Sequence, residues 1–390
     1  MRSINFLLIV LSFFSFSYVI HTDLPAESII STSITSTSVV APELVTLEVV
    51  TPELVTPDSS DCVTTMTPAD VSAEFASYVK HLDNTKEGML SLKVESVSFP
   101  VKQSQSSDKT FTRNGFLATR PGAVGTVIIC HGYTHSKHEA FFFKTYFPYF
   151  NVLAFDFRAH GELTQDQEST IGRDEMHDVY GAVQFVKNNP VLKGKPVIGF
   201  GFSMGAVALL MAQAEYENLF DALILDSPFE SSTDCMARSV DTFLSYTLFG
   251  RTYKLPGKSL IMFSLYNPRM QFIAKPVFKW SSGMNPSAVS TKFVPVIPLA
   301  TASKIKIPCM FISCNGDKNV ATDCVRKLYE AVHSPMKRFW ITLGLKHCGS
   351  CIAQPEMYNY KINSFIRKAL SSDFKVPTKV VDDRVVIKVA

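Results

Sequence analysis

The sequence lacks a marked excess of charge of either sign. Its 38 Lys and Arg and 35 Asp and Glu give a net charge of only +3, and the basic residues are scattered, which argues against a nucleic-acid partner. It also lacks the glycine-rich pattern of a nucleotide-binding loop, so we expect no cofactor. After residue 20 no apolar run is long enough to span a bilayer. These absences leave a small-molecule substrate as the expected partner, and they leave the oligomeric state open.

The N-terminus carries the pattern of a secretory signal peptide, assigned to residues 1–17. Arg2 precedes an apolar run over residues 4–14, and the small residues Ser15 and Ser17 predict cleavage after residue 17. We therefore expect a secreted or extracytoplasmic protein. The alternative is an uncleaved anchor near a membrane, because the apolar run extends to Ile20, close to the lower limit for a span.

Residues 18–66 have the composition of a disordered linker. Ser and Thr occupy every position from 31 to 38 except Ile34, and residues 41–46 recur almost unchanged at 51–56. So little apolar surface cannot offset the entropy lost on ordering, about 1 to 2 kcal/mol per residue. A helix is expected to follow over residues 67–82, where apolar residues recur at helical spacing.

The remaining sequence predicts one α/β domain over residues 67–370. An antiparallel strand pair is expected at 92–101 and 109–119. The apolar strands that follow alternate with helices, which is typical of a mostly parallel sheet flanked by helices. A helical lid insertion is expected at about 229–298. Residues 371–390 form a C-terminal tail, with a small hairpin but no function assigned to it.

One segment of the domain joins an apolar strand, 195–200, to a helical run, 206–214. Between them Gly201, Ser203 and Gly205 form the pattern Gly-x-Ser-x-Gly. In this context the pattern predicts a nucleophile elbow, because the glycines leave room for a tight turn that presents the serine hydroxyl. Ser203 is the predicted nucleophile. The alternative is that Ser203 only caps the helix.

A serine hydroxyl needs a histidine base and an acid that orients the histidine. Asp317 follows a buried strand over 308–313, and His347 follows the next strand, so both are expected at the carboxyl edge of the sheet. We predict Asp317 as the acid and His347 as the general base. Asp317 could instead only shape its turn, with Asp323 or Asp226 as the acid, and His347 could be a surface residue.

The oxyanion formed when Ser203 attacks a carbonyl group needs preorganised donors, each worth about 3 kcal/mol. The predicted oxyanion hole consists of the backbone amides of Tyr133, after the apolar strand 126–130, and of Met204, at a helix start. The side chain of Tyr133 is expected to line the pocket.

The order Ser203, Asp317, His347 is similar to that of the α/β-hydrolase superfamily, in particular its esterase-like and serine aminopeptidase-like branch. Further matches are His131-Gly132, Asp-x-Arg-x-His-Gly at 156–161, Asp-Ser-Pro-Phe at 226–229 and a helix-opening pattern at 170–178. The resemblance spans about residues 90–370. It implies an α/β-hydrolase fold and acyl chemistry through an acyl-enzyme.

The sequence departs from the pattern of this superfamily at two places. Ala159 stands where glycine is usual, and Ser313-Cys314 replaces a frequent His-Gly beside the expected acid. Several polar residues of the matching motifs are interpreted as structural, holding loops by hydrogen bonds and ion pairs. They are His131, Arg158, His160, Glu175 and Asp178.

The expected lid is rich in aromatic residues between 243 and 280. Such residues could roof an apolar acyl pocket over Ser203. The alternative is that most of them pack the lid against the body of the domain.

Eight cysteines are present, and four of them, Cys314, Cys324, Cys348 and Cys351, fall near the expected acid and base. In an exported chain this placement favours one or two disulfides. Free thiols, a four-cysteine zinc site and a redox pair at Cys348 and Cys351 are the alternatives. No metal is expected at the catalytic residues.

These observations predict a secreted serine hydrolase that cleaves a carboxylic ester or a related acyl bond. A serine peptidase with the same residues is the alternative within this class. A non-catalytic binding protein on the same scaffold is the alternative from another class, and the complete Ser, His and Asp set argues against it.

Overall fold

The structure, a computed structural model, describes residues 92–370 except 163, 166, 249–250, 273–288 and 345. The expected signal peptide, linker, helix over 67–82 and C-terminal tail lie outside the described residues. No helix within the described ranges is long and apolar enough to cross a membrane.

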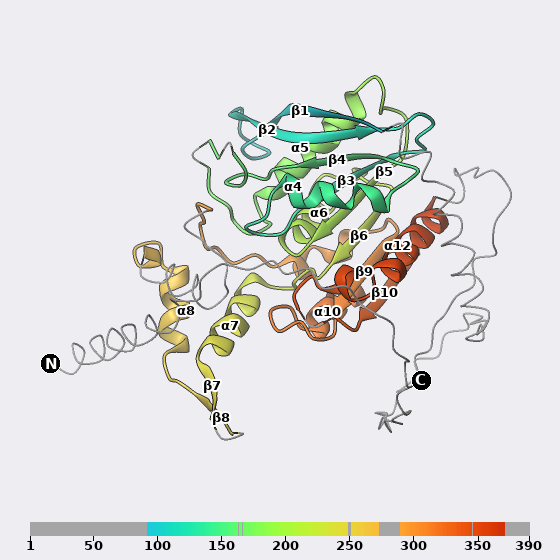
Figure 1. Cartoon of the computed structure of the whole chain (residues 1–390). Helices are drawn as coiled ribbons and strands as arrows, with labels where there is room; N and C mark the ends of the chain where they lie inside the picture. The colour runs from blue at the N-terminus through green and yellow to red at the C-terminus, as the bar shows by residue number, and fades with distance from the viewer. Residues whose placement is uncertain are drawn as a thin grey trace, which may run out of the picture. The chain divides into compact units, whose positions relative to one another are not determined.

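An eight-stranded sheet forms the centre of the domain (Figure 1), in the order β1-β2-β4-β3-β5-β6-β9-β10. Its strands, in chain order, are β1 (Lys93–Lys102), β2 (Thr110–Thr119), β3 (Thr126–Cys130), β4 (Asn151–Phe155), β5 (Val197–Phe202), β6 (Ala222–Asp226), β9 (Cys309–Cys314) and β10 (Lys337–Thr342). Strands β1 and β2 are antiparallel to their neighbours, and all other pairs are parallel. The predicted α/β fold with a mostly parallel sheet is confirmed.

Helices cover both faces of this sheet, which is why its central strands are apolar throughout rather than alternating. Every residue of β3, β4, β5, β6 and β9 is buried. One face packs on the helices α5 (Glu175–Asn188), α6 (Met204–Glu215) and α10 (Thr322–Ala331). The other face packs on α4 (Lys137–Phe142) and α12 (Pro355–Ala369).

Short elements lie in the connections between these layers. They are the 3-10 helices η1 (Phe143–Tyr146), between α4 and β4, and η2 (Pro298–Ala300) and η3 (Ala302–Lys304), before β9, and the helix α11 (Ser350–Ala353), between β10 and α12.

The insertion between β6 and β9, which we define as residues 229–298, contains a helix, a hairpin and a second helix. These are α7 (Ser232–Phe243), the strands β7 (Ser245–Leu248) and β8 (Arg251–Lys254), and α8 (Lys258–Tyr266). The returning chain is attached to the body by a parallel bridge between Ser169 and Thr291.

Candidate active site

The turn between β5 and α6 holds Ser203 in a strained backbone conformation, with φ 49° and ψ −112°. A β-carbon added to Gly205 would lie 2.3 Å from the carbonyl oxygen of Cys130, and one added to Gly201 would lie 2.7 Å from the amide nitrogen of Ala206. Only glycine fits at these two positions, because the turn brings two backbones into contact. The turn therefore has the geometry that the Gly-x-Ser-x-Gly pattern predicts, and α6 begins directly after Ser203.

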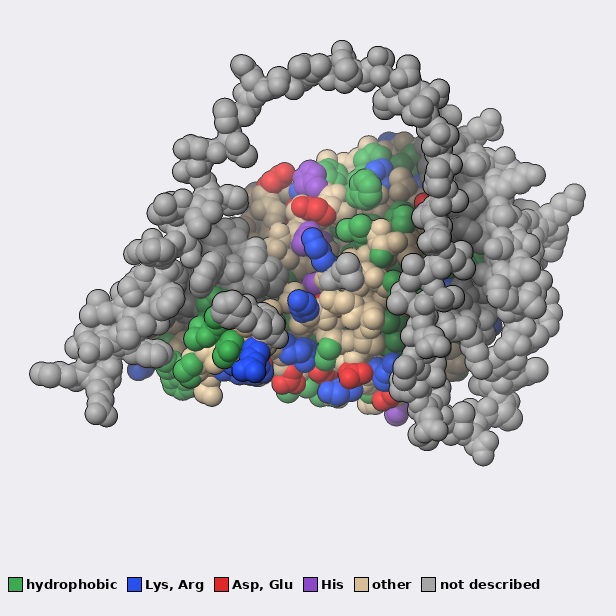
Figure 2. Space-filling view, turned by 60° about the horizontal axis from the view of Figure 1, so that its bottom comes forward, with side chains coloured by type: hydrophobic (Ala, Val, Ile, Leu, Met, Phe, Trp, Pro, Cys, Tyr) green, Lys and Arg blue, Asp and Glu red, His purple; other side chains and the backbone are tan. Residues whose placement is uncertain are grey.

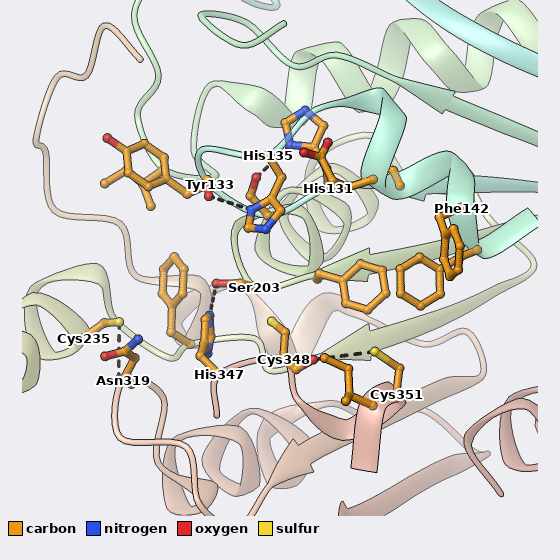
Figure 3. A pocket seen from close by; sticks show the side chains of 18 of the residues that line it. His131, Tyr133, His135, Phe142, Ser203, Cys235, Asn319, His347, Cys348 and Cys351 are labelled. Carbon is orange, nitrogen blue, oxygen red and sulfur yellow. Dashed lines mark hydrogen bonds between the residues drawn. The ribbon is translucent and has the colours of Figure 1, made fainter. Parts of the chain in front are cut away.

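Ser203, His347 and Asp317 form a continuous chain of hydrogen bonds (Figure 3). The distance from Ser203 Oγ to His347 Nε2 is 2.7 Å, and that from His347 Nδ1 to Asp317 Oδ2 is 2.6 Å. The second oxygen of Asp317 accepts the amides of Asn319 and Val320, both at 2.9 Å, which fixes the carboxylate in its turn. The structure thus brings together the three side chains that the sequence singles out.

The loops that carry the acid and the base are joined through their backbones. The pairing of β9 with β10 continues beyond the strands, because the amide of Asn315 donates to Thr342 and that of Gly316 to Gly344, both at 2.9 Å. The separation between Asp317 and His347 is therefore set by the edge of the sheet.

The other candidate acids do not reach His347. Asp323 is exposed near the start of α10. Asp226 is fully buried at the end of β6, where its carboxylate accepts hydrogen bonds from the hydroxyls of Tyr358 (2.7 Å) and Ser227 (2.9 Å). Burial raises the pKa of Asp226 to about 6.

The pKa of His347 is raised well above its ordinary value. Burial alone lowers this pKa, but the neighbouring Cys348 and the hydrogen bond with Asp317 raise it by more. Burial also raises the pKa of the Cys348 thiol, which is therefore uncharged at neutral pH. Asp317 is then the anion that stabilises a proton on His347.

The two predicted oxyanion donors come from different parts of the chain, Met204 directly after Ser203 and Tyr133 from the loop after β3. Met204 is the first residue of α6, so no carbonyl within that helix accepts its amide. Gly132 and Tyr133 line the same cavity as Ser203. The Tyr133 ring is almost fully buried, with its hydroxyl oxygen 2.6 Å from that of Thr291, so this side chain joins the body to the insertion.

The motif residues interpreted as structural are engaged within the fold. His131 Nε2 accepts the amide of Phe157 at 3.1 Å, and His160 Nε2 accepts that of Thr134 at 3.1 Å. Burial lowers the pKa of both histidines, which keeps them neutral. Arg158 forms an ion pair with buried Asp178 at 3.0 Å.

Glu175 is the first residue of α5 and is fully buried. Its carboxylate accepts the amides of Thr170 at 3.0 Å and Gly172 at 2.8 Å. It thus holds the loop that leads into α5, as the motif predicts.

A cavity of about 940 Å³ surrounds Ser203. In Figure 3, Phe142, Cys348 and Cys351 lie on one side of Ser203 and Cys235 and Asn319 on the other, and we call these two sides of the cavity its first and second arm. The first arm has a wall of packed aromatic rings, in which Phe143 lies 4.6 Å from Phe202 between ring centroids. The volume falls within the range of small-molecule sites.

The expectation that the aromatic residues between 243 and 280 roof this pocket is wrong for those that the structure describes. The residues of the insertion that line the cavity all precede residue 243; they are Phe229, Cys235, Met236 and Ser239. The aromatic wall comes instead from α4, η1 and Phe202. Helix α4 is not among the elements predicted above, although Ser136 and Glu139 form a capping box before an apolar run, which is a recognised helix-start signal.

The expected disulfide among Cys314, Cys324, Cys348 and Cys351 is also wrong, since all four are free thiols. Cys324 packs in the core on the α5 and α6 face of the sheet, whereas Cys348 and Cys351 pack against the core on the α12 face. The sheet therefore lies between Cys324 and the pair Cys348 and Cys351. Within the described ranges no cluster of His, Cys, Asp or Glu is arranged to hold a metal ion.

The sheet order, the elbow and the aligned Ser, His and Asp side chains define an α/β-hydrolase of the esterase and peptidase type. Comparison with known proteins identifies the family within that class. Residues 121–349 match the model of the family described as "Serine aminopeptidase, S33", and the chain belongs to this family.

Two individual proteins illustrate the similarity. The chain is 30% identical to the uncharacterized protein YqkD of Bacillus subtilis (strain 168) over 245 residues, which is 62% of this chain and 70% of that protein. Among solved structures it is similar to the esterase Pf2001 of Pyrococcus furiosus, with a TM-score of 0.51 and 22% identity. That match covers 78% of this chain and 96% of the esterase, and it supports the fold alone.

Proposed function

We propose that this protein is a serine hydrolase that cleaves carboxylic esters through an acyl-enzyme at Ser203. The observation that carries this proposal is the chain of hydrogen bonds from Ser203 through His347 to Asp317. A merely structural serine would not require a strained backbone that points its hydroxyl into a cavity.

The geometry supports the following sequence of steps. His347 Nε2 takes the proton of Ser203 Oγ as this oxygen attacks the ester carbonyl, and Asp317 stabilises the resulting imidazolium. The amides of Tyr133 and Met204 donate to the oxyanion. His347 then gives the proton to the departing alcohol, and it activates the water that releases the acid from Ser203.

The walls of the cavity favour an ester with an apolar acyl group. Phe143, Phe202 and Ile352 line one arm, and their contacts suit an alkyl chain rather than a charged group. Each methylene that enters this arm should contribute about 0.8 kcal/mol, close to fourfold in kcat/KM, until the arm is full.

The family membership makes a peptidase the second candidate, but the cavity offers little for an aminopeptidase substrate. Such a substrate carries an ammonium group, which needs a carboxylate partner once it leaves water. Among the described residues, Glu139 is the single carboxylate that lines the cavity. Its Oε2 accepts both the amide and the hydroxyl of Ser136 in the cap of α4.

The test compares kcat/KM for p-nitrophenyl acetate, butyrate, octanoate and palmitate with that for aminoacyl-nitroanilides. We expect kcat/KM to rise from acetate and then level off, and Phe143→Ala to lower the octanoate-to-acetate ratio about tenfold through lost burial. Phe263→Ala, which changes an exposed aromatic residue of the insertion, is the matched control and should leave the ratio unchanged. Faster cleavage of the nitroanilides than of every ester would instead identify a peptidase.

We also propose export of the protein, supported by the N-terminal sequence pattern. Free cysteines are uncommon in exported proteins, but five of the seven in the described part of the chain are buried. The mass of the mature N-terminal peptide from a secreting host tests this, with a start at Tyr18 expected and a start at Met1 contradicting cleavage.

A further inference from the structure

The acidic residues of this chain are distributed very unevenly. No Asp or Glu occurs between Asp241 and Asp317, whereas the same stretch contains nine Lys and Arg. Most of the insertion lies in this stretch. A region with bases but no acids is attracted to negatively charged partners even though the whole chain is close to neutral.

The hairpin of the insertion presents apolar and basic side chains on one face. Tyr246 pairs with Tyr253 and Leu248 pairs with Arg251, so these four side chains lie on the same side of the two strands. The tyrosine rings are stacked, with centroids 5.4 Å apart. Leu248 is 50% exposed and both tyrosines are more than 40% exposed, so this face is open.

Helix α8 is apolar around almost its whole circumference. Ile261 and Leu265 pack on the core of the domain, whereas Leu260 and Phe263, one turn apart, are 56% and 58% exposed. A helix with apolar residues on all sides is typical of a position buried in a protein or in lipid. Among the described residues, the contacts of α8 with the core come from the side that carries Ile261 and Leu265.

We define the insertion surface as the exposed residues between 246 and 272. Figure 2 shows hydrophobic and basic side chains together at the lower left, where α8 and the hairpin lie. Arg251, Lys254 and Arg269 are its exposed bases. An exposed patch of this kind marks an interaction site rather than ordinary surface.

We infer that the insertion surface binds peripherally to an anionic phospholipid bilayer. Leucine, phenylalanine and tyrosine side chains can enter the boundary between headgroups and acyl chains, while lysine and arginine contact the lipid phosphates. Helix α8 has nine residues, too few to span the bilayer.

Two other partners fit this surface less well. A second copy of the chain would bring a surface with the same positive charge and no acids, so the two copies would repel each other. A nucleic acid would satisfy the bases but would leave Leu255, Leu260 and Phe263 without apolar partners. The combination of charge and apolar area therefore favours a lipid surface.

Docking in this way would place the active-site cavity close to lipid. The insertion supplies both the binding surface and, through Met236 and Ser239 of α7, part of the cavity wall. An apolar substrate dissolved in the bilayer would then reach the cavity over a short path.

The test measures partition of the full chain onto phosphatidylcholine vesicles with and without about one third phosphatidylserine. We expect binding that requires phosphatidylserine and weakens at high salt. The double variant Arg251→Glu/Lys254→Glu should lower the partition coefficient about thirtyfold, which corresponds to about 1 kcal/mol for each lost base. The variant Leu260→Ser/Phe263→Ser should lower it by a similar factor.

Matched controls separate this effect from net charge and from unfolding. Lys304→Glu/Lys306→Glu makes the same charge change at exposed residues outside the insertion surface, and Val191→Ser removes an exposed apolar side chain from the body. Both controls should bind vesicles as the unchanged protein does, and all variants should unfold at similar temperatures. Equal loss in both charge variants, equal binding to neutral vesicles, or a dimer formed through residues 246–272 would overturn the inference.

Discussion

The body of the domain and the insertion use apolar residues in opposite ways. In the body, helices cover both faces of the sheet, and the central strands are buried at every position. In the described part of the insertion, α8 packs on the core through Ile261 and Leu265 but exposes Leu260 and Phe263, and the hairpin exposes apolar side chains as well. Apolar residues therefore form a buried core in the body and part of the exposed surface in the insertion.

The same difference extends to polar groups. Polar side chains of the body lie in fixed partnerships, such as Asp317 with His347 and Arg158 with Asp178. The exposed bases of the insertion surface have no acidic residue near them in the sequence. Chemistry is thus expected from the body and attachment from the insertion.

The largest effect should follow from substitution of Ser203, His347 or Asp317. Ser203→Ala, His347→Ala and Asp317→Asn should each lower kcat for a soluble ester by about 10⁴-fold or more, because the three groups act as a unit. Asp323→Asn, a nearby exposed carboxylate, is the control and should keep full activity. Arg251→Glu/Lys254→Glu in the insertion should also keep it, and a large loss there would contradict the division of roles.

The pH dependence of kcat/KM for the same reaction should show whether Asp317 stabilises the protonated form of His347. The base must be neutral to accept a proton, and its pKa is raised, so kcat/KM should fall as the pH drops through a value above 6.5. In the residual activity of Asp317→Asn this midpoint should move to lower pH. An unchanged midpoint would mean that Asp317 does not stabilise the charged imidazole.

A smaller effect is expected within α8 itself. Leu265→Ala should destabilise the protein by about 2 to 5 kcal/mol, as in any buried core, whereas Leu260→Ala should cost less than about 0.5 kcal/mol. Leu265 is fully buried and Leu260 is 56% exposed. Urea unfolding without lipid measures both, and equal losses would show that the outer side of α8 is covered by protein in solution.

Asp226 provides a test of the buried polar interior. Its pKa in the folded protein, about 6, lies above that of an unfolded aspartate, so the folded state binds the proton more tightly. Its contribution to stability is complete below about pH 4 and is lost as the pH rises to about 6, by about 2 to 3 kcal/mol. Asp226→Asn should remove this dependence in urea unfolding, whereas Asp323→Asn should keep it.

The smallest effect concerns Ala159, which adopts φ 61° in a loop where glycine is usual. Ala159→Gly should stabilise the protein by about 0.5 to 1 kcal/mol, because relief of the left-handed conformation exceeds the added entropy of the unfolded chain. Ala154→Gly, in the regular strand β4, should destabilise instead. Equal signs for the two substitutions would contradict the strain argument.

The sequence was sufficient to predict the fold and to place Ser203, Asp317 and His347 at one edge. Buried parallel strands appear as continuous apolar runs, and the residues that follow them must meet at the carboxyl edge. The catalytic roles stay predictions, but the positions follow from where the apolar runs of the strands end.

The sequence was not sufficient where the outcome depends on which side of an element faces the protein. Aromatic residues occur both in the insertion after Phe243 and around Phe143. Only tertiary packing decides that the first group lies largely at the surface and that the second lines the cavity. Each of the four cysteines lies close in the chain to Asp317 or His347. The sheet nevertheless lies between Cys324 and Cys348. Spacing along the chain carries no information about these separations.

The edge strand β10 also determines when during synthesis the site is completed. Ser203 and His347 are hydrogen-bonded across 144 positions of the chain, and His347 follows the last strand of the sheet. At about 5 to 20 residues per second, a ribosome reaches the histidine some 7 to 30 s after the serine. A nascent chain therefore carries an elbow without a base, and the hydroxyl of Ser203 stays unactivated until His347 has been synthesised and β10 has joined the sheet.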